Sequence, residues 1–173
     1  MVIVKRLNMK TRNTIILLAL PLMALLMTGC PVGLDYPLGK PGKEAINPAL
    51  VGTWVNNSSE SEVQRVRLEK GRDNNYIVTV LARGEMYALE TDNLTGWVTT
   101  VAEKNFFFAQ PEGEEKYYHY CYWMDGGTLV TQDVSLLDGG VDAVTSTETL
   151  RQQVESSMRM DAWATETQEW TKE

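Results

Sequence analysis

The chain has 173 residues, of which 43% are hydrophobic and 23% are charged, and its 16 basic and 23 acidic side chains give a formal charge of −7. This acidic balance argues against nucleic acid as a partner and against electrostatic adhesion to anionic lipid.

The first 29 residues have the pattern of an export signal. Four basic residues precede an apolar run of 13 residues, from Ile15 to Met27, which Pro21 interrupts. A helix that spans a bilayer needs about 20 apolar residues, so the run predicts a secretory signal and not a transmembrane helix. Met1 and Met9 both remain possible starts. Without residues 1–29 the chain keeps 12 basic and 23 acidic residues and has a formal charge of −11.

The signal ends in Leu26-Met27-Thr28-Gly29-Cys30, which resembles the lipobox of bacterial lipoproteins. The resemblance implies cleavage after Gly29, a diacylglyceryl thioether on Cys30 and N-acylation of that residue. Two or more acyl chains suffice for stable anchoring. Pro31 stands where aspartate would resemble an inner-membrane retention signal, so we expect the outer membrane, on its periplasmic face. The alternative is an ordinary secretory signal followed by a Cys30–Cys121 disulfide.

Residues 31–48 hold four of the six prolines and three glycines, with little periodicity. With the lipidated Cys30, they predict a flexible tether over residues 30–48. At about 3.1 Å per residue, the fully extended tether could hold a domain up to roughly 55 Å from its anchor.

From Ala49 onward, apolar residues recur with a period of two, which predicts short β-strands separated by turns rich in Gly, Asn and Asp. The spacing is typical of an antiparallel meander that curls into a small barrel or half-barrel. We therefore expect a mainly β domain over residues 49–173. The expected strands are Gln64–Glu69, Tyr76–Leu81, Glu85–Glu90, Gly96–Val101, Asn105–Ala109, Tyr117–Met124, Thr128–Gln132 and Val134–Leu137.

One helix is predicted near residues 145–160. Thr145 and Glu148 have the spacing of a capping box, and the apolar stripe of the helix consists of Leu150, Val154 and Met158. The stripe is narrow, so we expect the helix to lie against the flank or open end of the sheet. A last strand is predicted within residues 161–172.

Leu50-Val51-Gly52-Thr53-Trp54-Val55 resembles the G-x-W signature at the first strand of lipocalins and other calycins. The resemblance implies that Trp54 closes the floor of a barrel and that Gly52 lets the entering chain pass close by. It also implies a lipocalin-like domain. The order of tether, first strand, meander and late helix is similar to that of small bacterial lipoproteins.

Tyr117–Met124 contains the only histidine of the chain and one of its two cysteines. On a strand, His119 and Cys121 point the same way, with Cβ atoms roughly 7 Å apart, which is too far for the direct hydrogen bond of an activated thiolate. Both faces of this strand are aromatic, so we expect it to be packed on each side, with Cys121 buried.

No catalytic, metal-binding or cofactor-binding residue is predicted. Asp125-Gly126-Gly127 and Asp138-Gly139-Gly140 lack the alternating acidic ligands of a calcium loop and predict turns. A single histidine cannot build a zinc site, no G-x-S-x-G stretch is present, and no pair of carboxylates stands out.

Two functions remain after these exclusions, and neither is an enzyme. The first is an accessory protein of the cell envelope that acts by contact with another envelope component. The second is a lipocalin-like module that binds a small apolar molecule or an envelope lipid. The high aromatic content suits a filled barrel better than a large cavity, which favours the first.

Overall fold

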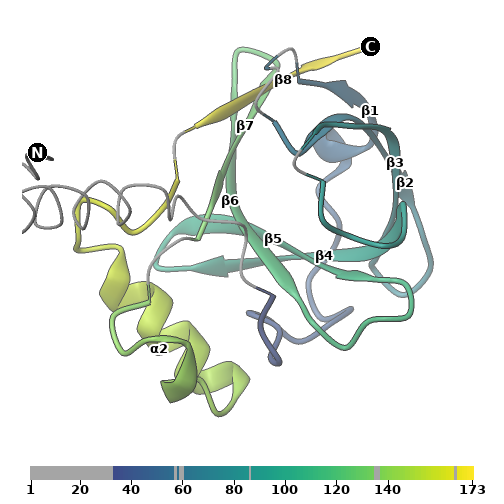
Figure 1. Ribbon diagram of the computed structural model, residues 1–173. Helices are drawn as coiled ribbons and strands as arrows, with labels where there is room; N and C mark the ends of the chain where they lie inside the picture. Colours follow the sequence, from purple (N-terminus) through teal and green to yellow (C-terminus); the bar gives the residue numbers. More distant parts are fainter. Residues whose placement is uncertain (1–32, 57, 59–60, 86, 135–136, 166) are drawn as a thin grey trace, which may run out of the picture. The chain divides into compact units, whose positions relative to one another are not determined.

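The computed structural model describes residues 33–173 apart from 57, 59–60, 86, 135–136 and 166 (Figure 1). The predicted signal peptide, residues 1–29, and the predicted lipidation site, Cys30, lie outside the described residues. Among the residues described, no helix is long and apolar enough to cross a membrane.

The described residues form eight antiparallel strands that close into a barrel, which confirms the predicted mainly β meander (Figure 1). Each strand pairs with the next, and β8 closes the barrel by pairing with β1 at Trp54 and Val55. The barrel is therefore complete, not a half-barrel. The strands are β1 Gly52–Val55, β2 Val63–Lys70, β3 Tyr76–Arg83, β4 Asn93–Val101, β5 Lys104–Pro111, β6 Tyr118–Asp125, β7 Thr128–Asp133 and β8 Gln168–Lys172.

Two of the expected strands differ from the structure. The expected strand at 85–90 is wrong, because the described residues of this range form the loop between β3 and β4. The amide of Tyr87 bonds back to the carbonyl of Gly84, and its hydroxyl bonds to the carbonyl of Thr91, so the segment satisfies its polar groups locally. In the expected strand 134–137, Val134 forms only an isolated bridge to Ala164, and residues 135–136 lie outside the description.

The predicted helix is present as α2, Thr147–Ser157, after β7. Its capping box lies one residue later than expected: Ser146 accepts from the amide of Thr149, whose hydroxyl oxygen accepts from the amide of Ser146. The apolar stripe packs on the barrel as predicted, with Leu150 and Val154 buried.

The barrel has a core inside its wall and a second core on the outside of one side. Because side chains alternate along each strand, β4, β5 and β6 contribute to both. The outer core lies between these strands, α2 and the chain before β1; it comprises Leu34, Leu38, Val101, Phe106, Cys121, Leu150 and Val154. Strand β6 is therefore packed on both faces, as its aromatic sequence predicts.

The segment predicted to be a flexible tether is packed against the barrel wall over its described part, from residue 33 on. Leu34 pairs with Tyr117 through two backbone hydrogen bonds, and Leu38 is fully buried. Arg151 of α2 also donates to the carbonyl of Leu38, at 3.0 Å. The prolines and glycines of this segment allow the chain to change direction, and two buried leucines, Leu34 and Leu38, pack it against the barrel. We call residues 34–47 the strap.

The two ends of the barrel differ. Because the strands are antiparallel and in sequence order, the connections after β1, β3, β5 and β7 all lie at one end, called here the four-loop end. The other end, the hairpin end, carries the three tight turns after β2, β4 and β6, and the short 3-10 helix η1, Pro48–Leu50, which leads into β1.

Candidate functional site

Trp54 closes the hairpin end of the barrel. Its side chain is fully buried, and its indole Nε1 donates to the carbonyl of Leu50 at 2.8 Å. The ammonium of Lys172, at the end of β8, lies 5.2 Å from the centre of the Trp54 ring. Trp54 is thus a buried residue of β1, held between η1 and the end of β8.

Gly52 enters β1 with a φ of +144°, a backbone conformation that favours glycine. A Cβ atom there would also lie 2.4 Å from Cε of Lys172. The flexible lysine could move aside, so the backbone angle is what requires glycine. Gly52 therefore provides the backbone conformation with which the chain enters β1.

Tyr76 completes the seal at this end. Its hydroxyl accepts from the amide of Asn47 and donates to the carbonyl of Asn47 at 3.0 Å. Burial raises the pKa of Tyr76, and the bond to Asn47 opposes that rise. The end of the strap is thereby tied to the first residue of β3.

Aromatic and aliphatic side chains fill the centre of the barrel. Tyr76 and Phe107 meet edge to face with ring centres 5.5 Å apart. The interior packing also includes Trp54, Leu68, Val78, Val80, Leu94, Val98, Ala109, Tyr122, Leu129 and Trp170. The middle of the barrel is therefore a packed core.

His119 and Cys121 point to the outer face of β6, under the strap and α2. Cys121 is 2% exposed, and burial raises the pKa of its thiol. His119 stacks on Phe108 with ring centres 6.3 Å apart, and its Nε2 has no hydrogen-bond partner within the described part of the chain. Cys121 therefore belongs to the outer core, as predicted, and His119 is buried on the same face of β6 against Phe108.

Burial lowers the pKa of His119 to about 4, although a hydrogen bond to the backbone of Tyr36 opposes this effect. The unfolded chain, with a pKa near 6.5, therefore binds the proton first as the pH falls, and stability is lost between about pH 6.5 and 4. We expect this loss to reach about 3 kcal/mol at pH 4.

The measurement is the unfolding free energy of the native protein and of His119→Phe, by urea titration at pH 7 and pH 4. The difference between the two proteins should shift by the stated amount in favour of the variant. The carbonyl of Tyr36 loses its donor in the variant at both pH values, so that cost cancels. A difference that does not change with pH would contradict the prediction.

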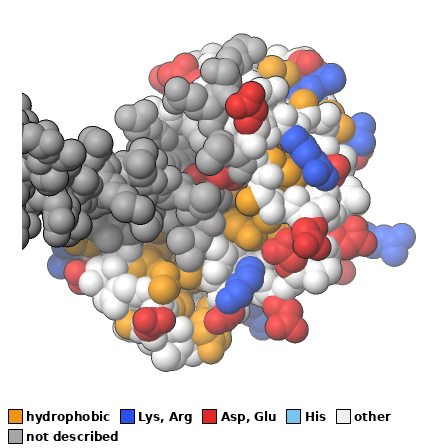
Figure 2. Space-filling view, viewed as in Figure 1, with side chains coloured by type: hydrophobic (Ala, Val, Ile, Leu, Met, Phe, Trp, Pro, Cys, Tyr) orange, Lys and Arg blue, Asp and Glu red, His pale blue; other side chains and the backbone are white. Residues whose placement is uncertain are grey.

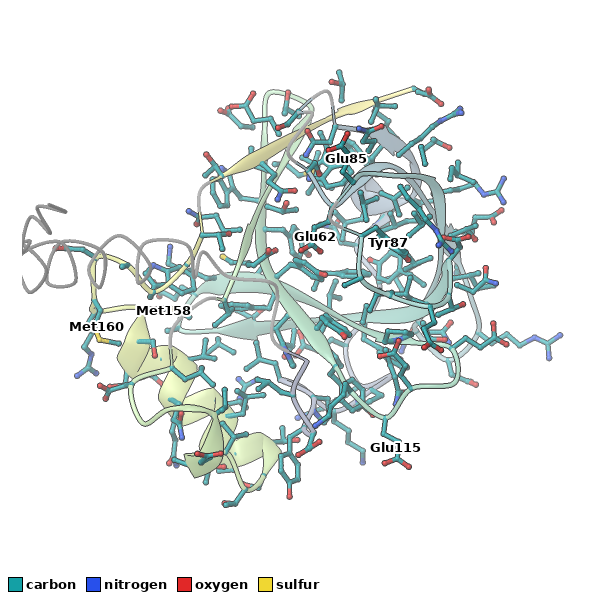
Figure 3. The ribbon with its side chains drawn as sticks, in the orientation of Figure 1. Glu62, Glu85, Tyr87, Glu115, Met158 and Met160 are labelled. Carbon is teal, nitrogen blue, oxygen red and sulfur yellow. The ribbon has the colours of Figure 1, made fainter. Side chains whose placement is uncertain are left out.

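At the four-loop end, two carboxyl groups lie among tyrosines. Glu62 precedes β2, and Asp133 ends β7; Tyr87, Tyr118 and Tyr120 are their aromatic neighbours. Figure 3 shows Glu62 and Tyr87 within the ring of strands, whereas Glu115 lies away from them. We call these five residues the carboxyl–tyrosine cluster.

Local bonds hold both carboxyl residues in place. The carbonyl of Glu62 accepts from the amide of Gly84 at 2.7 Å, and the preceding Ser61 donates to the carbonyl of Val63. Asp133 exchanges two bonds with Thr165, whose hydroxyl accepts from the amide of Asp133 at 2.9 Å. The backbone at both positions is thus fixed by neighbouring chain segments.

Burial in this cluster favours the neutral carboxyl groups. It raises the pKa of Glu62 to about 7, with a further contribution from Asp133, and it raises the pKa of Asp133 to about 6. Burial also raises the pKa of Tyr87 to about 12. Two neighbouring, partly buried carboxyl groups resist simultaneous ionisation, because each carboxylate is poorly hydrated and the two negative charges repel each other. A cation bound between them would offset this unfavourable electrostatic energy.

The cluster offers carboxylate oxygens and tyrosine rings, which together suit an organic cation. In the described part of the chain, no group of three or more His, Cys, Asp or Glu side chains is placed to hold a metal ion. Sequence reasoning missed the pair because only the pairing of strands along the whole chain brings Glu62 and Asp133 to one end.

The two Asp-Gly-Gly stretches are turns, as predicted. Gly126 and Gly127 have φ of +54° and +97° in the hairpin between β6 and β7. Asp138 accepts from the hydroxyl of Ser156 at 2.8 Å, and its amide donates to the hydroxyl of Ser157. It therefore ties its turn to the end of α2.

Comparison with protein-family models, with characterised proteins and with solved structures gave no match. The likeness to lipocalin-like barrels consists of the closed eight-stranded antiparallel architecture, the helix after β7, and the positions of Gly52 and Trp54.

Proposed function

We propose that this chain is a lipoprotein of the bacterial outer membrane, held by acyl chains on Cys30, and that its barrel acts by contact with another envelope component and not by catalysis. The signal pattern and the lipobox resemblance of residues 26–30 support the anchor. Pro31 after the cysteine supports the outer membrane as the place of the anchor.

The packed interior of the barrel carries the proposal of a contact role. Large rings occupy the space that an apolar ligand would need, and Trp54 and Tyr76 close the hairpin end. The outer surface, in contrast, leaves large apolar side chains accessible: Ile77 is 51% exposed and Trp123 is 37% exposed. Exposed aromatic residues are frequent anchors of protein interfaces.

The surface composition agrees with this role. On the face drawn in Figure 2, acidic and basic side chains are interspersed, and hydrophobic side chains lie between them. Such a mixed surface suits a specific contact better than general electrostatic attraction.

A second candidate is a binding module, and the carboxyl–tyrosine cluster favours it. Glu62 and Asp133 lie in partly buried positions at the four-loop end. Their chemistry points to a small cationic ligand in place of the apolar molecule or envelope lipid that the sequence suggested.

The anchor is tested by metabolic labelling with a palmitate analogue. We expect label on the native chain and none on Cys30→Ser, which should move to the soluble envelope fraction. Label that persists on Cys30→Ser would rule out this anchor.

The contact role is tested by photo-crosslinking in intact cells and native mass spectrometry of the purified protein. A photoreactive residue at Ile77 or Trp123 should give a discrete protein adduct, whereas the same residue at exposed Glu115, at the four-loop end, serves as the control. Native spectra should show no bound small molecule. A co-purified small molecule that Glu62→Gln abolishes, with no adduct, would favour the second candidate instead.

A further inference from the structure

The described chain is fixed to the barrel almost from its first residue. The amide of Leu34 donates to the carbonyl of Tyr117 at 2.9 Å, and the amide of Tyr117 donates back at 2.8 Å. Leu34 is 8% exposed, and the next residue, Asp35, forms an ion pair with Lys116. A Cβ atom at Gly33 would lie 3.0 Å from Cβ of Lys116 and 3.2 Å from the ring of Tyr118, so the chain is closely packed here.

The link between this fixed point and the predicted anchor is short. Only Pro31, Val32 and Gly33 separate Cys30 from Leu34 in the sequence. A fully extended chain advances at most about 3.5 Å per residue, so Leu34 lies no more than about 14 Å from an acylated Cys30. The long reach expected of a free tether is therefore not available to this barrel.

The fixed point lies at the four-loop end. Tyr117 directly precedes β6, and β6 then runs to Asp125 at the hairpin end. At about 3.3 Å per residue, the seven steps along β6 place Asp125 roughly 23 Å from Tyr118. A barrel held at Leu34 thus keeps its hairpin end much farther from the anchor.

A groove marks the surface around the fixed point. Its lining includes Asp35 of the strap, the neighbouring Gly33 and Lys116, and Val141 and Asp142 from η2, Val141–Ala143. Val141 is 48% exposed. We call these five residues the exit patch.

We propose that the exit patch is the membrane-facing surface of the protein and rests on the zwitterionic phospholipid headgroups of the bilayer that holds Cys30. The proposal depends on the lipid anchor proposed above. The short link keeps the patch close to the bilayer surface, whatever path the three linking residues take.

Charge selects the kind of lipid. The Lys116–Asp35 pair is neutral as a unit, and Asp142 adds an exposed carboxylate to the patch. The chain after residue 29 has a formal charge of −11, so anionic headgroups would repel it. The ammonium group of a zwitterionic headgroup is the complementary partner for Asp142.

This orientation leaves the apolar side chains of the hairpin end turned away from the membrane. Ile77 follows the first residue of β3, and Trp123 lies near the end of β6, so both belong to that end. They would be accessible to a protein partner in the periplasm, as the contact role requires.

The test uses the full acylated protein in phosphatidylethanolamine–phosphatidylcholine vesicles that contain a lipid with a nitroxide on its headgroup. A fluorescent thiol label is placed at Asp142→Cys or Glu115→Cys at the four-loop end, and at Asp125→Cys at the hairpin end. All three positions are exposed, whereas Cys121 is buried and should not react in the folded protein. Quenching should be several-fold stronger at Asp142 and Glu115 than at Asp125.

A second variant lengthens the link. Twelve Gly and Ser residues inserted between Val32 and Gly33 would reach about 20 Å as a flexible coil, and we expect them to remove the difference between the two ends. Equal quenching at all three labels in the chain without the insertion would overturn the proposal. Stronger quenching at Asp142 in phosphatidylglycerol vesicles would overturn the choice of lipid.

Palmitate labelling of each preparation separates the two proposals. If the label is absent, the anchor itself fails. If the label is present and the three positions are quenched equally, the anchor stands and the orientation fails.

Discussion

Replacement of Trp54 by alanine should lower the free energy of unfolding by about 4 kcal/mol, in the range found for large aromatic residues in cores. Trp54 is fully buried at the hairpin end, where it packs with Leu50 and the interior of the barrel. Alanine would leave a cavity and would also leave the carbonyl of Leu50 without its indole donor. Urea titration monitored by far-ultraviolet circular dichroism measures the loss.

Two control variants separate burial from the hydrogen bond. Trp54→Phe keeps much of the ring and loses the bond to Leu50, so we expect a smaller loss than for alanine. Trp123→Ala removes a tryptophan that is 37% exposed and should cost about 1 kcal/mol or less. If Trp54→Ala and Trp123→Ala had equal effects, Trp54 would not close the barrel.

The strands that the sequence predicted well are those in which inward and outward residue types alternate along the whole strand. In β6, inward Tyr122 and outward Cys121 are both buried, because α2 and the strap cover the outer face. The residue types on the two faces already indicated this double packing. Residues 85–90 alternate over a few positions only, and there Tyr87 bonds within its own loop.

Closure of the barrel could not be predicted from local pattern. It depends on the pairing of Trp54 with Lys172, from opposite ends of the domain, and no short-range signal specifies this pair. The same limit applies to the carboxyl–tyrosine cluster. Glu62 and Asp133 are ordinary acidic residues in the sequence, and only the closed barrel places them at one end.

The strap was missed for a different reason. Proline and glycine in residues 31–48 are typical of a flexible linker, and two leucines among 18 residues do not form a periodic pattern. The hydrogen bonds that fix the strap come from residues far away in the sequence. Tyr117 pairs with Leu34 through the backbone, and Arg151 donates to the carbonyl of Leu38. Composition alone does not report such contacts.

Alanine at both Leu34 and Leu38 should lower the free energy of unfolding by about 5 kcal/mol, because each buried leucine contributes about 2–5 kcal/mol. Leu38 is fully buried and should give the larger single effect, whereas Leu34 keeps 8% of its surface exposed. The two side chains belong to one core cluster, so their effects need not add fully. Urea titration of the single and double variants measures each loss.

Leu81→Ala is the matched control, since this leucine is 40% exposed on β3 and should cost about 1 kcal/mol or less. A free tether would make the double variant no more damaging than this control, and that result would contradict the packed strap.

Hydrogen exchange is an independent test of the strap. The amides of Leu34 and Tyr117 bond to each other's carbonyls and should exchange slowly in the native protein. In the double variant we expect the strap amides to exchange faster than those of β4 and β5. Release of the strap would also lengthen the link between Cys30 and the barrel. The same two substitutions should therefore weaken the difference in membrane quenching between Asp142 and Asp125, even where the barrel itself stays folded.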